Sequence, residues 1–339
     1  MTADPQIAPA AAQMHQLLAG FEVSQALYVV AELDIATVLL QGPRRVDDLA
    51  TSVGANADAL ERLIRFLVPL GVFHTSGRDV ELTELGRTLA DGPADSMRDV
   101  ARYLMRTDYA PFSRLLHTVR TGDAAATEYL GQPFFDWINA TEGLAELQNA
   151  AMAGFTTGGR GDLLDRLEFP SGDTIADIGG ADGTLLAEIL RRLPGRRGIV
   201  FDTPSVVAAA TAKLAAAGLA DRTTTVSGNF FDSVPAADIY VLSAVLHDWD
   251  DASALRILNA IGGAANPGAH LLLFELVVPE DDAPHAAKIV DFTMMTMLGG
   301  RERTESQWRR LLDEGGFTLD RITSGSGMYC AIEATVCRR

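Results

Sequence analysis

The chain of 339 residues has only two cysteines, Cys330 and Cys337, and lacks any long apolar run. Two thiols cannot form a disulfide framework or a four-ligand zinc site. The chain has no stretch of about 18 uncharged apolar residues, so we expect no membrane-spanning helix. Its first residues lack a cationic start followed by an apolar run, so we expect no signal peptide. These absences predict a soluble, cytoplasmic protein.

Positive charge is also scarce, because 28 Lys and Arg residues stand against 45 Asp and Glu residues, for a net charge of −17. Such an acidic surface repels phosphate backbones and anionic lipids, so we expect neither nucleic acid nor membrane as a partner. Hydrophobic residues nevertheless make up 47% of the chain and charged residues 22%, which excludes wholesale disorder. A chain of this length is expected to form two domains.

Residues 1–110 are predicted to be mostly helical. Apolar residues recur at helical spacing over residues 17–30, and they offer more apolar surface than a small domain can bury alone. This surplus predicts a homodimer.

Residues 42–90 have the pattern of a winged helix. A helix ends at Gly54, a second begins at Asn56, and a short two-stranded wing follows over residues 72–82. The segment has six Arg residues against seven Asp and Glu residues. Because a DNA reader needs a cationic face, we favour dimerisation over DNA binding here.

Two further segments with different sequence patterns follow. Residues 111–165 are predicted to form a helical linker rich in large apolar and aromatic side chains, some of which we expect to line an acceptor pocket. Residues 166–339 alternate strand-like runs with helical patterns. This alternation predicts an α/β domain with a mostly parallel sheet covered on both faces. Ligands of such sheets bind at the carboxyl ends of the strands.

The glycine-rich run DIGGADG, residues 177–183, follows one strand and opens a helix. Its spacing matches neither a dinucleotide fingerprint nor a P-loop, so it is either a tight structural turn or a site for another ligand. Asp177 and Asp182 disfavour phosphate. Asp202 ends the next strand, 20 residues after Asp182, where a carboxylate accepts from two ribose hydroxyls. A nucleoside without a phosphate to hold indicates S-adenosylmethionine.

His247 lies just past the carboxyl end of another predicted strand, where ligands bind in this kind of fold. Glu275 ends the following strand, and Glu302 lies in the run GGRERTE. A carboxylate that accepts from one ring nitrogen would orient the other nitrogen as a base. With a pKa of about 6.5, a histidine can take the proton of a phenol. The alternative is a histidine that only caps its loop. We expect no metal site.

Several motifs together resemble the S-adenosylmethionine-dependent small-molecule O-methyltransferases of the caffeic-acid type, in their bacterial natural-product branch. They are DIGGADG, FDTPSVV, SGNFFDSVP, LHDWDD, LLLFELVVPE, DFTMMTMLGGRERTESQW and LLDEGGF, and the resemblance covers nearly the whole chain. It implies a Rossmann-like class I methyltransferase domain behind a winged-helix dimerisation domain. It also implies a homodimer that methylates a hydroxyl, phenolic in kind, of an aromatic small molecule without a metal.

The resemblance further assigns roles to individual positions. It implies that His247 is the catalytic base and that Glu275 and Glu302 are the acids flanking it. The residues implied to bind the cofactor are Asp177, Gly179, Asp202, Asn229, Phe230 and Ser243. The residues implied to line the acceptor pocket are Phe134, Met152, Phe155, Asp248, Met294 and Met295.

Three positions depart from the family pattern. Ala181 replaces the usual third glycine, a small change that we expect to be tolerated. Asn229 replaces an aspartate that usually meets the adenine, and Ser243 replaces a lysine common in plant members. Two other functions remain open at this stage: an enzyme on the same scaffold that does not methylate, and a winged-helix regulator that senses a metabolite.

Overall fold

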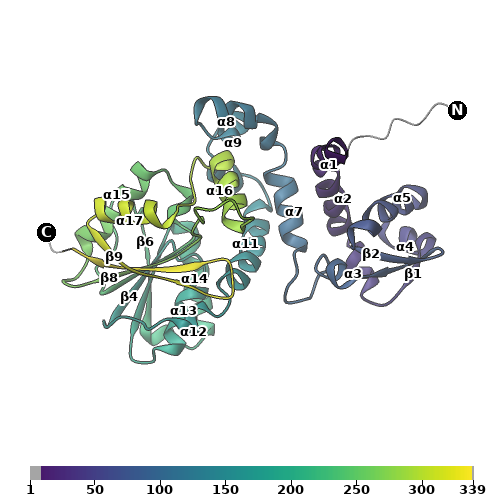
Figure 1. The fold of residues 1–339 in the computed structure, drawn as a ribbon. Helices are drawn as coiled ribbons and strands as arrows, with labels where there is room; N and C mark the ends of the chain where they lie inside the picture. The colour runs from purple at the N-terminus through teal and green to yellow at the C-terminus, as the bar shows by residue number, and fades with distance from the viewer. Residues whose placement is uncertain (1–8, 338–339) are drawn as a thin grey trace. The chain divides into compact units, whose positions relative to one another are not determined.

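The computed structural model describes residues 9–337, apart from the side chains of residues 153–158 and of Ser205. The chain divides into two compact units (Figure 1). One contains the residues up to Ser113 together with Phe135–Phe155. The other contains Arg114–Phe134 together with the residues from Thr156 onward. No helix within residues 9–337 is long and apolar enough to cross a membrane.

The first unit is mostly helical. Its elements before Arg114 are the helices α1 (Pro9–Leu18), α2 (Gly20–Glu32), α3 (Ile35–Leu39), α4 (Val46–Val53), α5 (Ala57–Leu67), α6 (Glu84–Arg87) and α7 (Arg98–Thr107), and the 3-10 turn η1 (Val68–Leu70). A small antiparallel sheet has the strand order β1 (Arg44–Arg45), β3 (Asp79–Leu82), β2 (Phe73–Ser76). The 3-10 turn η2 (Pro111–Arg114) and the helices α10 (Phe134–Ala140) and α11 (Leu144–Arg160) cross the division between the units.

The winged-helix pattern predicted for residues 42–90 is confirmed. Helix α4 ends at Gly54, whose φ of 68° is a left-handed conformation that glycine adopts without strain. Asn56 then caps α5, because its Oδ1 accepts from Ala59 N at 3.0 Å. Gly71, with a φ of 79°, ends the turn after α5 and leads into the two-stranded wing.

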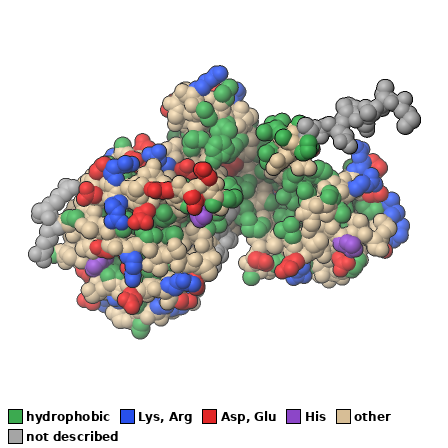
Figure 2. All heavy atoms as spheres, in the orientation of Figure 1, with side chains coloured by type: hydrophobic (Ala, Val, Ile, Leu, Met, Phe, Trp, Pro, Cys, Tyr) green, Lys and Arg blue, Asp and Glu red, His purple; other side chains and the backbone are tan. Residues whose placement is uncertain are grey.

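Helices α1 and α2 carry the apolar surplus noted in the sequence. Val30 is fully buried, whereas Leu17, Leu18 and Phe21 are between 56% and 72% exposed. Figure 2 shows hydrophobic side chains gathered over α1. Within the described chain, this surface has no covering element, which is what the dimerisation hypothesis requires.

The second unit is built on a seven-stranded sheet. Its strand order is β6 (Thr223–Ser227), β5 (Arg197–Asp202), β4 (Thr174–Ile178), β7 (Ile239–Ser243), β8 (His270–Glu275), β10 (Cys330–Val336), β9 (Phe317–Ser324). The five strands from β6 to β8 in this order are parallel to one another, and β10 is antiparallel to both β8 and β9. The predicted mostly parallel sheet is therefore confirmed.

Helices cover both faces of this sheet (Figure 1). One face packs against α12 (Leu163–Arg166), α13 (Thr184–Arg192) and α14 (Pro204–Ala216), and the other against α15 (Asp251–Ala264) and α17 (Glu305–Glu314). Short 3-10 turns follow α14 and β7, namely η3 (Ala220–Arg222) and η4 (Leu246–Asp248). Helix α16 (Ala286–Met297) packs against α8 (Leu115–Thr121) and α9 (Ala125–Leu130).

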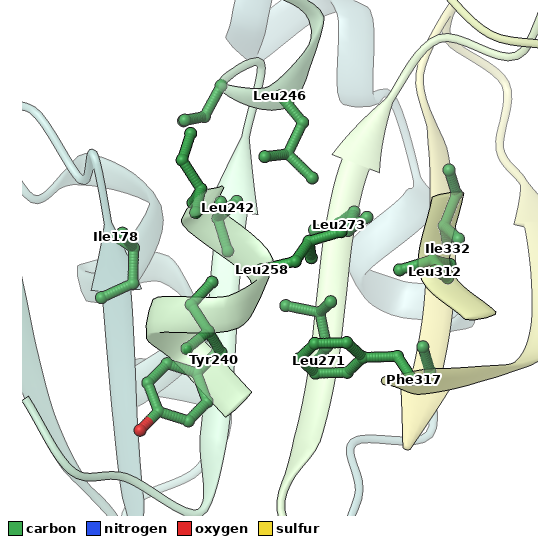
Figure 3. Packing of buried hydrophobic residues seen from close by; sticks show 14 of the residues in the cluster. Ile178, Tyr240, Leu242, Leu246, Leu258, Leu271, Leu273, Leu312, Phe317 and Ile332 are labelled. Carbon is green, nitrogen blue, oxygen red and sulfur yellow. The ribbon is translucent and has the colours of Figure 1, made fainter. Parts of the chain in front are cut away.

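The period of two along β7 explains why both faces are apolar. Tyr240 and Leu242 point to the α15–α17 side, where Leu258 packs against them (Figure 3). Ile239 and Val241 belong to the cluster on the α13–α14 side. A strand buried on both faces reads as a continuous hydrophobic run, as IYVL does.

Candidate active site

The candidate site lies where the parallel strands of the second unit end. The strand order reverses between β4 and β7, and ligands of such sheets bind outside the carboxyl ends of the strands at that point. The glycine turn, residues 179–183, follows β4, and Asp202 ends β5. Ser243 ends β7 and Glu275 ends β8. One edge of the sheet thus carries most of the residues that the sequence singled out.

Backbone geometry shapes the glycine turn. Gly179 has a φ of 70°, and its N–H donates to Phe201 O at 2.8 Å, which ties the turn to β5. A Cβ added at Gly179 would lie 2.9 Å from Val245 Cγ2, so a larger residue would not fit there. Ala181, at the usual third glycine, adopts a φ of 46° and donates its N–H to Asp202 Oδ2 at 2.9 Å. The turn therefore accommodates this departure from the family pattern.

The two acids near the turn are placed very differently. Asp202 is half-buried, and its carboxylate accepts from Ala181 N and from Thr203 N, which leaves further lone pairs open. Asp182 instead accepts from Thr184 N and Oγ1 and pairs with Lys213 Nζ at 2.5 Å. Burial raises the pKa of Asp182, but the hydrogen bonds from Lys213 and Thr184 outweigh it and hold that pKa below its usual range. Asp182 is thus engaged within the fold.

Asp177 lies beneath the glycine turn. A Cβ added at Gly180 would come within 2.9 Å of Asp177 Oδ2, which is buried and without a hydrogen-bond partner among the described residues. Burial raises the pKa of Asp177 to about 7, and the charge of Arg160 opposes this shift. The carboxyl is consequently shielded by the turn rather than presented at its surface.

The remaining predicted cofactor residues surround the same edge. Asn229 is exposed, and its Oδ1 accepts from Phe231 N at 3.0 Å. The Phe230 ring lies edge-on to Trp249, with ring centres 6.0 Å apart. Ser243 Oγ is buried and has no partner among the described residues. Trp249 was not among the predicted site residues, although the LHDWDD run contains it.

His247 lies in η4 and is surrounded by acids. Its Nδ1 lies 2.6 Å from Glu302 Oε1 and 4.0 Å from Glu275 Oε2, and its Nε2 lies 3.4 Å from Asp248 Oδ1. We call these four residues the His247 cluster. The bond to Glu302 assigns a proton to Nδ1 and leaves Nε2 as the nitrogen able to accept one. The structure therefore brings the three predicted catalytic residues together.

Glu275 is held by the backbone. Its Oε1 accepts from Val245 N at 3.1 Å and from Leu246 N at 2.8 Å, and its side chain is fully buried. Its Oε2, like Glu302 Oε2, is buried without a partner among the described residues. Glu275 therefore fixes the start of η4, whereas Glu302 contacts the imidazole directly.

The electrostatics of the cluster differ from the sequence-based expectation. Burial lowers the pKa of His247, but the charges of Asp248, Glu275 and Glu302 outweigh it and raise that pKa to about 10. Burial also raises the pKa of Glu275 to about 7 and that of Asp248 to about 6. An ordinary histidine pKa was expected, so this expectation was wrong: without ligands, the cluster favours the imidazolium.

His247, Glu275 and Glu302 also offer ligand atoms within 4.8 Å of one another, which is close enough to consider a metal ion. Two ligands of one tetrahedral zinc lie roughly 3.3 Å apart. The 2.6 Å between His247 Nδ1 and Glu302 Oε1 is instead a hydrogen-bond distance, and Glu275 Oε1 already accepts two backbone N–H groups. The geometry favours an acid–base cluster.

Three of the predicted pocket residues lie in the second unit on elements of, or tied to, the His247 cluster. Asp248 belongs to the His247 cluster. Met294 and Met295 are half-buried on α16, which is tied to the cluster because Glu302 N donates to Asp291 Oδ1 at 2.9 Å.

The other three predicted pocket residues lie on α10 and α11. Phe134 is buried at the start of α10. Met152, half-buried on α11, belongs to the first unit. Phe155 lies outside the described side chains.

Comparison with known proteins identifies the family. Residues 112–318 match the O-methyltransferase domain, and residues 15–92 match the O-methyltransferase dimerisation domain. The chain belongs to the O-methyltransferase family. It is 37% identical over 328 residues to phenazine O-methyltransferase of Lysobacter antibioticus, with 96% of each chain covered. It is 36% identical to 3-amino-4-hydroxybenzoate 4-O-methyltransferase of Streptomyces cremeus, with 94% of this chain and 89% of that one covered.

Solved structures agree with this assignment. Human N-acetylserotonin methyltransferase bound to S-adenosylmethionine is similar with a TM-score of 0.87 at 28% identity, over 99% of this chain and 100% of that one. An O-methyltransferase from neocarzinostatin biosynthesis, bound to S-adenosylmethionine and a hydroxy-methylnaphthoic acid, has a TM-score of 0.83 at 31% identity, over 93% and 96% of the chains. The predicted family, fold and cofactor are confirmed: the chain is an S-adenosylmethionine-dependent O-methyltransferase.

Proposed function

We propose that this enzyme methylates a phenolic hydroxyl of a flat aromatic intermediate in natural-product biosynthesis, with His247 as the general base. The observation that carries the proposal is the buried hydrogen bond of 2.6 Å between His247 Nδ1 and Glu302 Oε1. This bond leaves Nε2 as the nitrogen that accepts a proton, and it places a negative charge beside the imidazolium that forms.

The half-exposed carboxylate of Asp202 supports its role as the acceptor for the ribose hydroxyls, because its free lone pairs can each take a further hydrogen bond. Gly179 would let the cofactor approach the backbone, since it carries no side chain. We assign Ser243 to the same site because its buried Oγ lacks a partner among the described residues. We assign Asn229 and Phe230 there from their positions in the SGNFFDSVP motif. Bound there, S-adenosylmethionine supplies an electrophilic methyl group.

The carboxylates around the imidazole support the role of His247 as the general base. A phenol has a pKa of about 10, and the carboxylates raise the pKa of His247 to about 10. Because the carboxylates raise the proton affinity of the imidazole toward that of a phenol, the imidazolium and the phenolate form with a smaller uphill step than at an ordinary histidine. Because unliganded His247 favours its charged form near neutral pH, the ring must lose one proton before it can accept the proton of the phenol. The positive charge of S-adenosylmethionine, bound next to the ring, would lower the pKa of His247 and so promote that loss.

The nature of the acceptor is inferred from the relatives. Their names describe acceptors such as a phenazine, an aminohydroxybenzoate and, for the neocarzinostatin enzyme, a hydroxynaphthoate. All are flat and aromatic. The half-buried Met294 and Met295 on α16 suit such rings, since thioethers pack well against aromatic faces. We assign Asp248 to the same pocket because it lies beside His247 Nε2.

A second function is favoured by one relative. Aclacinomycin 10-hydroxylase of Streptomyces purpurascens is 34% identical over 319 residues, with 91% of this chain and 85% of that one covered. The scaffold therefore also carries chemistry other than methyl transfer. The intact His247–Glu302 pair favours methylation in the present chain.

We also propose that residues 1–110 form a homodimer and that residues 166–339 bind the cofactor. The exposed Leu17, Leu18 and Phe21 support the dimer. A DNA-sensing role is disfavoured, because α5 carries two acids and two bases and so presents no cationic face.

Transfer of a radiolabelled methyl group tests the function directly. The enzyme is incubated with labelled S-adenosylmethionine and a panel of hydroxylated phenazines, benzoates and naphthoates, each matched to the analogue that carries an amine in place of the hydroxyl. We expect label on the hydroxylated members only. Label on the amines alone, or oxidation of an acceptor without label, would overturn the proposal.

A further inference from the structure

Arg303 is a fully buried cation that holds the backbone on both sides of His247. Its Nη1 donates to Leu246 O at 3.0 Å, and its Nη2 donates to Trp249 O at 3.0 Å. Its Nε donates to Asp251 Oδ1 at 2.9 Å, and its guanidinium lies 5.1 Å from the centre of the Trp308 ring. Arg303 was not among the predicted site residues, although the run GGRERTE contains it.

The backbone that carries Arg303 is itself fixed. Val278 N donates to Arg303 O at 3.0 Å, and this pairing places the segment beside the end of β8. Thr304 follows directly and caps α17 in a capping box with Gln307. Glu302, the residue before Arg303, reaches the imidazole from the same segment. Consecutive residues of one anchored segment thus hold the side chain of His247 and the turn that bears it.

Burying a guanidinium costs free energy, because the charge loses its hydration. Burial lowers the pKa of Arg303, and its carboxylate partner, Asp251, is 43% exposed and so offers only partial compensation. The guanidinium does offer donors in a fixed plane that reach two carbonyls and a carboxylate at once, whereas an ammonium offers fewer donors without that fixed geometry and an apolar side chain offers none. One carbonyl belongs to Leu246, the first residue of the 3-10 turn η4, and the other to Trp249, which directly follows the turn. Such a short turn lacks the regular hydrogen bonds of a longer helix.

We propose that Arg303 is a positioning residue, which acts through His247 by fixing η4 so that the imidazole meets Glu302 and the acceptor. The inference rests on the proposed function, because it takes His247 as the base. A displacement of about 1 Å at a reacting group costs on the order of 10²-fold in rate. Loss of the Arg303 guanidinium should therefore lower kcat strongly and change the affinity for the cofactor at the glycine turn only slightly.

The test compares Arg303→Lys and Arg303→Met with the control Arg301→Met. Arg301 contacts the same carboxylate of Asp251 at 3.1 Å, but its side chain is 47% exposed. We expect kcat to fall about 10- to 100-fold in Arg303→Met and less in Arg303→Lys, while the Kd for S-adenosylhomocysteine changes less than about threefold. The apparent pKa of the rate should fall, because the imidazole loses its fixed contact with Glu302. Arg301→Met should stay within about twofold of the wild type, since an exposed ion pair contributes little.

A double-mutant cycle separates positioning from a merely structural effect. If Arg303 acts through His247, Arg303→Lys adds less than about twofold to the loss already caused by His247→Ala. An equal loss in both backgrounds, or a lower melting temperature with kcat unchanged, would overturn the inference. Should Arg303→Met fail to fold, the comparison of Arg303→Lys in the two backgrounds decides between these outcomes. If His247→Ala alone leaves kcat intact, the proposed base fails, and that result is obtained before Arg303 is varied.

Discussion

The glycine turn and the His247 cluster lie at the same sheet edge but are built by opposite means. At the glycine turn, backbone conformation dominates: Gly179 takes a left-handed φ, and Asp202 is oriented by two backbone N–H groups. At the His247 cluster, side chains from three separate segments meet in a buried space, and their charges shift one another's pKa.

This difference predicts which mutations impair cofactor binding and which impair the chemical step. A backbone-built site depends on a few local conformations, so single side-chain changes there affect cofactor affinity alone. A cluster of coupled charges responds as a unit, so a change at one member alters the proton affinity of the others. Binding and chemistry should therefore separate cleanly in mutants of the two regions.

Asp202→Ala should have the largest effect on binding. It removes the proposed acceptor for the ribose hydroxyls and the partner of Ala181 N. Charged hydrogen bonds of this kind contribute roughly 1.5–3 kcal/mol, so the Kd for S-adenosylhomocysteine should rise about 10- to 150-fold. Titration calorimetry measures it. An unchanged Kd in a folded variant would remove Asp202 from the cofactor site.

Glu302→Gln should reduce the limiting rate about tenfold, because the imidazolium loses a charged partner at 2.6 Å. The same change should move the pH–rate profile to lower pH, since a neutral amide no longer raises the pKa of His247. Glu275→Gln is the matched comparison. Burial already raises the pKa of Glu275 to about 7, so the neutral amide resembles a form populated near neutral pH, and a smaller loss is expected. A larger loss for Glu275→Gln would reverse these assignments.

Asp182→Asn should have the smallest effect, although Asp182 lies within the glycine turn. Its partners are Thr184 and Lys213, and the ion pair with Lys213 is about half exposed. Such a pair contributes below about 1 kcal/mol to stability. The Kd for S-adenosylhomocysteine should stay within about twofold of the wild type. A Kd about tenfold weaker would show that this carboxylate meets the cofactor after all.

The sequence predicted the fold well because its signals are local. The Gly54 break, the Asn56 cap and the apolar run of β7 each depend on a few neighbouring residues, and the structure confirms them. The glycine run was likewise recognisable as a turn between a strand and a helix, although its spacing left its ligand open. That Asp182 is engaged by Lys213, 31 residues away, was not visible in the sequence.

The cluster was only partly predictable for the same physical reason. Motif positions indicated His247, Glu275 and Glu302, but the pKa of His247 depends on how closely three carboxylates approach a buried ring. Arg303 was missed because the contacts that tie it to the turn of His247 are the backbone carbonyls of Leu246 and Trp249, and a backbone carbonyl is present whatever the residue type.

The most direct test of the central claim is the pH dependence of kcat for the wild type and His247→Ala with one phenolic acceptor. A base whose pKa is raised must lose its proton before it acts, so the wild-type rate should rise from neutral to alkaline pH. His247→Ala should be slower by roughly 10²–10⁴ at about pH 7. The cationic cofactor lowers the pKa of His247 in the complex, so the wild-type rate should level off below the pKa of the acceptor. The gap should then narrow as the pH approaches that pKa, where solvent supplies the phenolate. Equal rates of the two proteins at neutral pH would contradict the account and leave positioning alone to explain the enzyme.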